Sequence, residues 1–131
     1  MEPDMSESHV PIEISFENGL VLDATMDRVQ APLIVEDIKS MLPFEGKAVL
    51  MRGEMKITLG ISRGNAKPTK DVEKGDLAYM PLGDSICIYL DDMKTFSPVN
   101  IIGSIVSDEQ EIEKLREVRR GSSATLKAAE N

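Results

Sequence analysis

The chain has 131 residues, a mass of 14.4 kDa and a formal net charge of −8 at pH 7. Its length suits one domain around a single core, and its composition, 41% hydrophobic and 29% charged, is that of a globular protein. The acidic balance repels phosphate backbones and disfavours a nucleic-acid partner, and no apolar run approaches the roughly 20 residues that span a bilayer.

The start of the chain is polar and acidic and shows no export signal. Residues 1–9 hold no periodic apolar pattern, so we expect a flexible N-terminal tail that carries the only histidine, His9. The only cysteine, Cys87, lies in an apolar run and is expected to be a buried small hydrophobe rather than half of a disulfide. Together these features predict a cytoplasmic location.

A β-hairpin is predicted near the start of the folded part. Apolar residues alternate over Val10–Phe16 and again over Leu20–Ala24, and the turn-forming pair Asn18-Gly19 lies between the two runs.

A short helix is predicted to follow the hairpin, from Pro32 to Leu42. Proline suits the first turn of a helix, and the pair Leu42-Pro43 ends it. The residues expected on its apolar face are Leu33 or Ile34, Ile38, Met41 and Leu42. We expect this helix to plug or cap a sheet.

The middle of the chain contains two β-like runs and a long loop. The runs Lys47–Met51 and Met55–Ile61 are separated by Arg52-Gly53-Glu54, so they are either one kinked strand or two paired strands. The stretch Ser62–Asp71 is the strongest interior loop signal, because it is rich in Gly, Pro, Asn and Lys.

The second half of the chain predicts further short strands and one more helix. The expected strands are Leu77–Met80, Ser85–Leu90, Val99–Val106 and, from a weak alternation, Ser122–Ala128. Asp91–Pro98 is expected to be an irregular crossover, and Glu109–Val118 a helix capped by Ser107 or Asp108. The crossover and the long loop are the expected places for specificity.

These elements define a mostly-β fold. About eight short strands with one or two short helices, without a βαβ rhythm or a repeat, favour a closed barrel, which also removes exposed strand edges. We therefore expect a single domain over residues 10–128, followed by a C-terminal tail of residues 129–131.

Five segments occur in an order that resembles a known family. They are Leu42-Pro43-Phe44-Glu45-Gly46, Arg52-Gly53-Glu54, residues 75–83, residues 86–89 and residues 99–105. In this order they resemble the small cyclophilin-like β-barrel family of short bacterial and archaeal proteins, from about Val10 to Leu126. Members of that family typically carry tryptophan where this chain has Arg52 and Met80, and this chain has no tryptophan.

The resemblance implies a candidate groove. Cyclophilins isomerise the bond before proline by holding the proline ring in an apolar pocket and directing an arginine at the twisting amide, and Arg52 is the candidate for that catalytic role. The residues expected to line the groove are Phe44, Met51, Glu54, Met55, Tyr79 and Met80. The alternative for Arg52 is a surface ion pair with Glu54, which would contribute little.

Other kinds of chemistry find little support in the sequence. A single histidine in a tail disfavours a Ser-His-Asp or Cys-His arrangement and a zinc site. Asp84, Asp91 and Asp92 flank one strand, but they lack the glycine-spaced pattern of a calcium loop. The glycines form no phosphate-binding run, so we expect no metal and no cofactor.

Three functions remain open from the sequence. The first is a peptide- or small-molecule-binding domain without strong catalysis. The second is a peptidyl-prolyl isomerase that uses Arg52. The third is a homo-oligomeric interaction protein whose contact is a sheet edge or the helix face of Ile112, Leu115 and Val118. The expected state in solution is a monomer or a weak homodimer.

Overall fold

Nine strands and three short helical segments make up the part of the chain that the computed structural model describes, residues 8–129. In chain order the elements are β1 (His9–Phe16), β2 (Val21–Asp27), α1 (Pro32–Met41), β3 (Phe44–Met51), β4 (Glu54–Thr58), β5 (Pro68–Val72), β6 (Asp76–Met80), β7 (Ser85–Tyr89), β8 (Met93–Ile105), α2 (Glu109–Glu113), the 3-10 helix η2 (Lys114–Glu117) and β9 (Ser122–Ala128).

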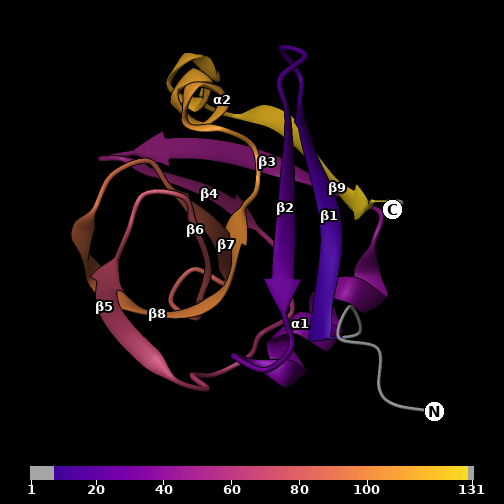
Figure 1. Cartoon of the computed structure of the whole chain (residues 1–131), viewed down its shortest axis with the longest axis vertical. Coiled ribbons are helices and arrows are strands. Elements are labelled where there is room, and N and C mark those ends of the chain that lie inside the picture. The colour runs from indigo at the N-terminus through magenta and orange to yellow at the C-terminus, as the bar shows by residue number, and fades with distance from the viewer. Residues whose placement is uncertain (1–7, 130–131) are drawn as a thin grey trace.

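Eight of the strands form a closed antiparallel barrel. Their order is β2-β1-β9-β3-β4-β7-β6-β8, and β2 pairs again with β8 to close the ring. The ninth strand, β5, pairs with β8 alone and lies outside the ring (Figure 1). The predicted closed barrel of about eight strands with short helices is confirmed. The weakly predicted strand Ser122–Ala128 is β9, which lies between β1 and β3.

The β1–β2 hairpin forms where the alternation predicted it. The side-chain oxygen of Asn18 accepts from the Leu20 amide at 3.0 Å and fixes the turn. β1 begins one residue before the predicted domain, because His9 pairs with Asp27. The remaining residues of the predicted N-terminal tail, 1–7, lie outside the described residues. At the other end the Ala129 amide donates to the Pro11 carbonyl, and residues 130–131 lie outside the described part.

Helix α1 and the α2–η2 segment lie at opposite ends of the first hairpin (Figure 1). α1 buries Ile34, Val35 and Ile38, whereas Leu33 is exposed, so Ile34 rather than Leu33 belongs to the apolar face. The helix ends at Met41, as predicted from Leu42-Pro43.

The second predicted helix is shorter than expected and gives no free face. α2 is capped by the Asp108 side chain, which accepts from the Glu111 amide, and the chain then tightens into η2. Ile112, Leu115 and Val118 are buried in the barrel core. The prediction that these three form an interface with a second copy is therefore wrong, because the chain's own barrel covers them.

The long loop and the crossover differ most from prediction. The predicted loop Ser62–Asp71 contains most of β5, and the predicted crossover Asp91–Pro98 belongs largely to β8. Asp71 pairs with Lys94, but Thr69 pairs with Val99, so β8 bulges between these two points. Polar residues interrupt both segments, which is why their apolar alternation is weak in the sequence.

The apolar residues form two clusters on opposite faces of the barrel wall. The larger cluster fills the barrel interior. The smaller one lies on the outer face of β6, β7 and β8 and consists of Val72, Ala78, Met80, Cys87, Tyr89 and Val99. We call β5 and residues 93–99 of β8 the strap, because their inward-facing residues Val72 and Val99 cover this outer cluster.

The closing seam between β2 and β8 depends on Gly103. A Cβ atom there would lie 1.9 Å from the carbonyl oxygen of Thr25, which is backbone and cannot move aside cheaply. Gly103→Ala is expected to lower the free energy of unfolding by about 3 kcal/mol or more, measured by urea denaturation. Gly64→Ala is the matched control, since nothing lies within 4 Å of its Cβ position. Equal midpoints for the two variants would contradict the role given to this seam.

Candidate functional site

The predicted groove residues are not brought together. Met55 and Tyr79 point into the barrel and are fully buried in its core, and Phe44 packs against that core. Glu54 and Met80 are buried at the outer wall, and Met51 is 49% exposed. These side chains lie on both faces of the wall, so they do not line one groove.

Arg52 lies on a turn rather than in a strand. The pairs Met51–Glu54 and Leu50–Met55 make β3 and β4 two paired strands, with Arg52 and Gly53 at the turn between them. Arg52 has a φ of 51° and an exposed side chain. Met80 pairs with Ser85, which pairs with Thr58 at the far end of β4, so Arg52 and Met80 do not share a pocket.

The expected ion pair between Arg52 and Glu54 is also absent among the described residues. Instead, Glu54 accepts a hydrogen bond from the Tyr89 hydroxyl at 2.6 Å and pairs with Lys56 at 3.2 Å. Glu54 and Tyr89 stand directly opposite each other on β4 and β7. Glu54 is 8% exposed, and both of its carboxylate oxygens have partners in the wall itself.

The outer cluster holds two groups that do not ionise near neutral pH. Burial, with a contribution from the Glu54 charge, raises the pKa of the Cys87 thiol to about 12. Burial also raises the pKa of the Tyr89 hydroxyl well above its ordinary value, and the neighbouring Cys87 and Glu54 add to the effect. The predicted burial of Cys87 is confirmed, and its thiol is a packing group rather than a nucleophile.

A second polar network holds the loop between β4 and β5. Asp84 accepts from the Tyr79 hydroxyl at 2.5 Å and from the amides of Ile61 and Ser62 at 3.2 and 3.0 Å. Burial works to raise the pKa of Asp84, but these hydrogen bonds outweigh it and hold the pKa below its ordinary value. Burial and the bond to Asp84 raise the pKa of Tyr79 to about 12.

The same loop is fastened at two further points. The Arg63 guanidinium forms an ion pair with Asp37 of α1. The Asn100 side-chain oxygen accepts from the amides of Ala66 and Lys67 at 2.8 and 2.9 Å. These contacts set the course of the chain into β5. No local sequence pattern indicates them, because the partners are 26 to 34 residues apart in the chain.

The strap presents an open strand edge and an exposed aromatic ring. Among the described residues β5 pairs only with β8, so one row of its backbone groups faces away from the sheet. Phe96 lies in the bulge of β8 and is 91% exposed, whereas its neighbours Thr95 and Ser97 are buried. The bulge is closed by the Thr95 hydroxyl, which donates to the Ser97 carbonyl at 2.7 Å.

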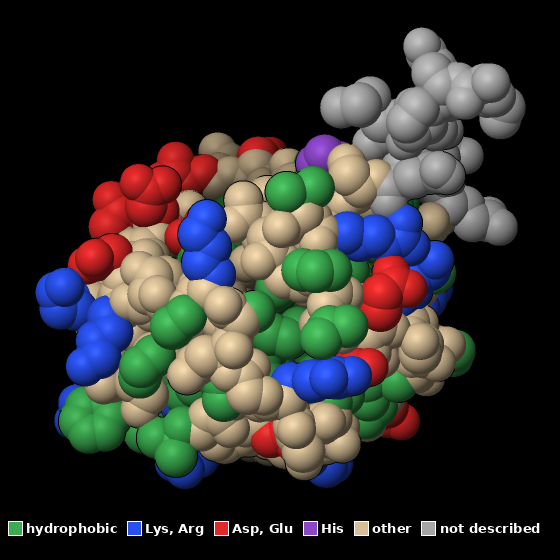
Figure 2. Space-filling model, turned by 90° about the horizontal axis from the view of Figure 1, so that it is seen from below, with side chains coloured by type: hydrophobic (Ala, Val, Ile, Leu, Met, Phe, Trp, Pro, Cys, Tyr) green, Lys and Arg blue, Asp and Glu red, His purple; other side chains and the backbone are tan. Residues whose placement is uncertain are grey.

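Basic side chains accompany this edge. Lys67, Lys70 and Lys94 are exposed on or beside the strap, and Lys94 forms an ion pair with Asp71 at 2.8 Å. In the view of Figure 2, hydrophobic and basic side chains lie next to each other on the left, the side on which Figure 1 shows β5, while acidic side chains gather above them.

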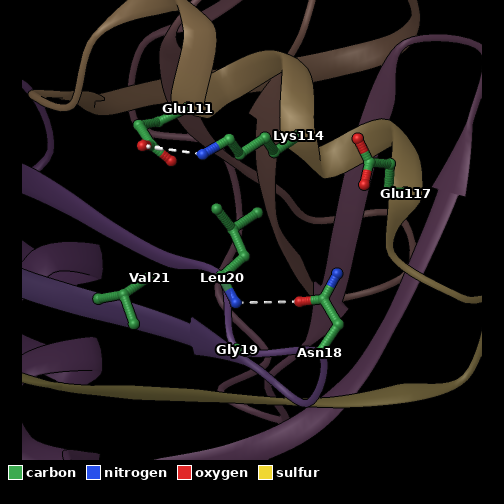
Figure 3. A pocket seen from close by; sticks show the side chains of 7 residues that line it. All are labelled: Asn18, Gly19, Leu20, Val21, Glu111, Lys114 and Glu117. Carbon is green, nitrogen blue, oxygen red and sulfur yellow. Dashed lines mark hydrogen bonds and ion pairs between the residues drawn. The ribbon is translucent and has the colours of Figure 1, made fainter.

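Shallow depressions mark the outer surface of the described residues. One of about 440 Å³ lies between the tip of the first hairpin and the α2–η2 segment (Figure 3). Its charged groups already have partners in part, since Lys114 bonds to Glu111 at 3.2 Å. A second, of about 330 Å³, lies where β2 meets β8, and a third, of about 380 Å³, lies beside β1 and β9.

Two further properties concern the described residues only. Within residues 8–129, no three His, Cys, Asp or Glu side chains lie close enough together to hold a metal ion. None of the helices in that range has the length and apolar character needed to cross a membrane.

A closed eight-stranded antiparallel barrel, with α1 after the first hairpin and a short helix before the last strand, defines a cyclophilin-like domain. The chain belongs to the Cyclophilin-like family, whose sequence model matches residues 10–127. The resemblance inferred from the five sequence segments is thereby confirmed. No curated protein matches the chain.

The solved structures that are similar to this chain include the following two. The hypothetical protein AF2241 from Archaeoglobus fulgidus has 26% sequence identity and a TM-score of 0.74, with 93% of this chain and 96% of that chain covered. McbB, solved in complex with tryptophan, has 15% identity and a TM-score of 0.74. The match covers 92% of this chain but 45% of McbB, and at this identity it shows the fold alone.

The depressed pKa of Asp84 predicts a pH dependence. Its ionised form contributes stability above the unfolded-state pKa of about 4, and this contribution is lost as the pH falls through the lower folded-state pKa. Asp84→Asn is expected to cost about 1 kcal/mol at pH 7 and to speed amide exchange at Ile61 and Ser62. Asparagine tolerates the positive φ at this position, so the backbone is not an added cause.

Asp71→Asn is the control for this experiment. Asp71 is exposed and makes one surface ion pair, which contributes little. If both variants lose the same free energy of unfolding at pH 7, Asp84 does not hold the loop through its charge.

Proposed function

We propose that this protein is a binding domain for an extended, acidic peptide segment that adds a strand to the open edge of β5. The observation that carries this proposal is Phe96, a nearly fully exposed aromatic ring beside β5, which lies outside the closed ring. Backbone groups on a free edge supply affinity for any extended chain, and side-chain contacts beside it supply specificity. Phe96 supplies the apolar contact.

Charge favours an acidic segment over other extended chains. The whole chain carries a net charge of −8, yet Lys67, Lys70 and Lys94 accompany this edge. Lysine on an edge strand also discourages indiscriminate pairing, so a partner of opposite charge is selected. The strap is held in place by the outer cluster beneath it, which keeps the edge preformed.

The isomerase alternative lacks comparable support. That chemistry needs an apolar wall beside the arginine, whereas Met55 and Tyr79 face the barrel interior and Arg52 is exposed on a turn. We therefore assign no catalytic role to Arg52. The proposal keeps the peptide-binding function expected from the sequence and places the binding site on the strap.

The binding test uses a synthetic heptapeptide, acetylated Glu-Val-Glu-Leu-Glu-Val-Glu, titrated into the labelled protein and followed by amide NMR. We expect saturable shifts along β5 and the bulge of β8. Phe96→Ser is expected to weaken binding roughly fivefold to thirtyfold, since it removes part of the contact of a buried aromatic ring. Leu82→Ser is the matched control, because Leu82 is also exposed and lies on the β6–β7 turn.

Two peptide controls separate the causes. The same sequence with lysine in place of glutamate should bind more weakly, and a version N-methylated at alternate residues should not pair with the edge. Binding that survives N-methylation, or shifts centred away from the strap, would refute strand addition. Accelerated cis–trans exchange of an Ala-Pro peptide that disappears in Arg52→Ala would favour the isomerase instead.

We further propose that the protein is a monomer. Two copies of β5 paired antiparallel about a two-fold axis would place Lys70, at the centre of the strand, opposite its own copy. Like charges directly opposite each other destabilise a strand pair. The expected result is a mass of about 14.4 kDa by light scattering at 0.1 mM protein. A concentration-dependent dimer would contradict the proposal that the protein is a monomer. If Lys70→Ser strengthened that dimer, the repulsion between the paired lysines would still be supported. If Lys70→Ser left the dimer unchanged, the charge argument would fail as well.

A further inference from the structure

β2 and β5 share one edge of β8 and leave a gap between them. Ser104 pairs with Asp76 of β6 and with Thr25 of β2, so β6 and β2 lie on opposite edges of β8. Asn100 likewise pairs with Tyr79 of β6 and with Pro68 of β5. β2 reaches only to Gly103, and residues 101–102 therefore have no strand partner on the shared edge.

A depression opens at this gap, on the outer wall of the barrel. Its volume is about 330 Å³, near the lower end of the range for small-molecule sites. The residues that line it are His9, Thr25, Asp27, Gln30, Ile101, Gly103 and Ser104. None belongs to β5, so this notch is distinct from the proposed peptide edge even though both adjoin the same edge of β8.

The polar groups in the notch have bonding capacity to spare. Asp27 uses one carboxylate oxygen, Oδ1, to accept from the Val29 amide at 2.9 Å, and Oδ2 has no partner within residues 8–129. The His9 ring uses Nδ1 with the Ser8 hydroxyl at 3.0 Å. Within the same range the side chains of Thr25, Gln30 and Ser104 make no hydrogen bond, so their oxygens are available to a ligand in the depression that Ile101 also lines.

The charge of the lining points to one class of ligand. Asp27 is the only carboxylate in the lining, and neither lysine nor arginine is among the lining residues. A cation with N–H groups satisfies the free carboxylate oxygen and the hydroxyl and amide oxygens, whereas an anion would meet Asp27. The half-buried Ile101 offers an apolar contact for a short hydrocarbon chain.

We propose that this notch binds a small organic ammonium ion, with Asp27 accepting from its N–H groups and Ile101 contacting its hydrocarbon chain. Thr25 and Ser104, opposite each other across the closing seam, accept further N–H groups. The site exists only because the barrel closes through β2 and β8 while β5 stops short of the seam.

The test uses n-butylammonium chloride, titrated into the full labelled chain at constant ionic strength and followed by amide NMR. We expect saturable shifts at Thr25, Asp27 and residues 101–104. Asp27→Asn should weaken the binding roughly 1.5-fold to fivefold, which is the range of an ion pair at a partly exposed site. The asparagine keeps an oxygen for the Val29 amide, so the turn after β2 is preserved.

Three controls make the outcome decisive. Asp23→Asn removes a carboxylate from the same strand outside the notch and should leave binding unchanged. Butanol tests the charge, and tetramethylammonium, which has no N–H group, tests the hydrogen bonds; both should bind more weakly. Equal effects of the two substitutions, equal binding of butanol, shifts spread over all surface acids, or the lack of saturable shifts would each overturn the proposal.

Discussion

Three residue pairs between β2 and β8 close the barrel, and the other surface features depend on this seam. The pairs are Ala24–Ile105, Thr25–Ser104 and Met26–Gly103. Gly103 permits them, because no side chain fits between its Cα and the Thr25 carbonyl. A strand of 13 residues is longer than this seam requires, so the first part of β8 extends past the ring and carries β5 with it. The strap and the notch are both consequences of that surplus length.

The strap decides which wall residues are accessible. Met80, Cys87 and Tyr89 face outward from the barrel, and without β5 they would lie on the surface. Covered by the strap, they form a second apolar cluster into which the Glu54–Tyr89 hydrogen bond is set. A buried carboxylate is tolerable only with its oxygens paired, and Tyr89 and Lys56 provide those partners. The outer wall is therefore a packed layer, and both proposed binding sites lie beside this layer rather than on it.

Both proposed sites lie along one edge of β8, yet they suit different chemistry. The edge of β5 offers backbone groups, lysines and Phe96, which favours an extended acidic chain. The notch offers a carboxylate, hydroxyls and an amide above Ile101, which favours a small cation. Membership of the Cyclophilin-like family establishes the barrel beneath them, and the function rests on the sites themselves.

Local patterns in the sequence determined the elements that depend on near neighbours. The Asn18-Gly19 hairpin, the helix between Pro32 and Leu42-Pro43, and the burial of Cys87 each follow from a few adjacent residues. The five segments that resemble the family predicted the closed barrel as well. Tertiary structure alone decided which strands pair and which face each residue takes. Met55 and Met80 look alike in the sequence but lie on opposite faces of the wall. β5 and the start of β8 form strands because they pair with each other. His9, Asp27 and Ser104 come together only because the ring closes. Alternation in the sequence indicates that a segment is a strand, but it does not indicate which strand pairs with it.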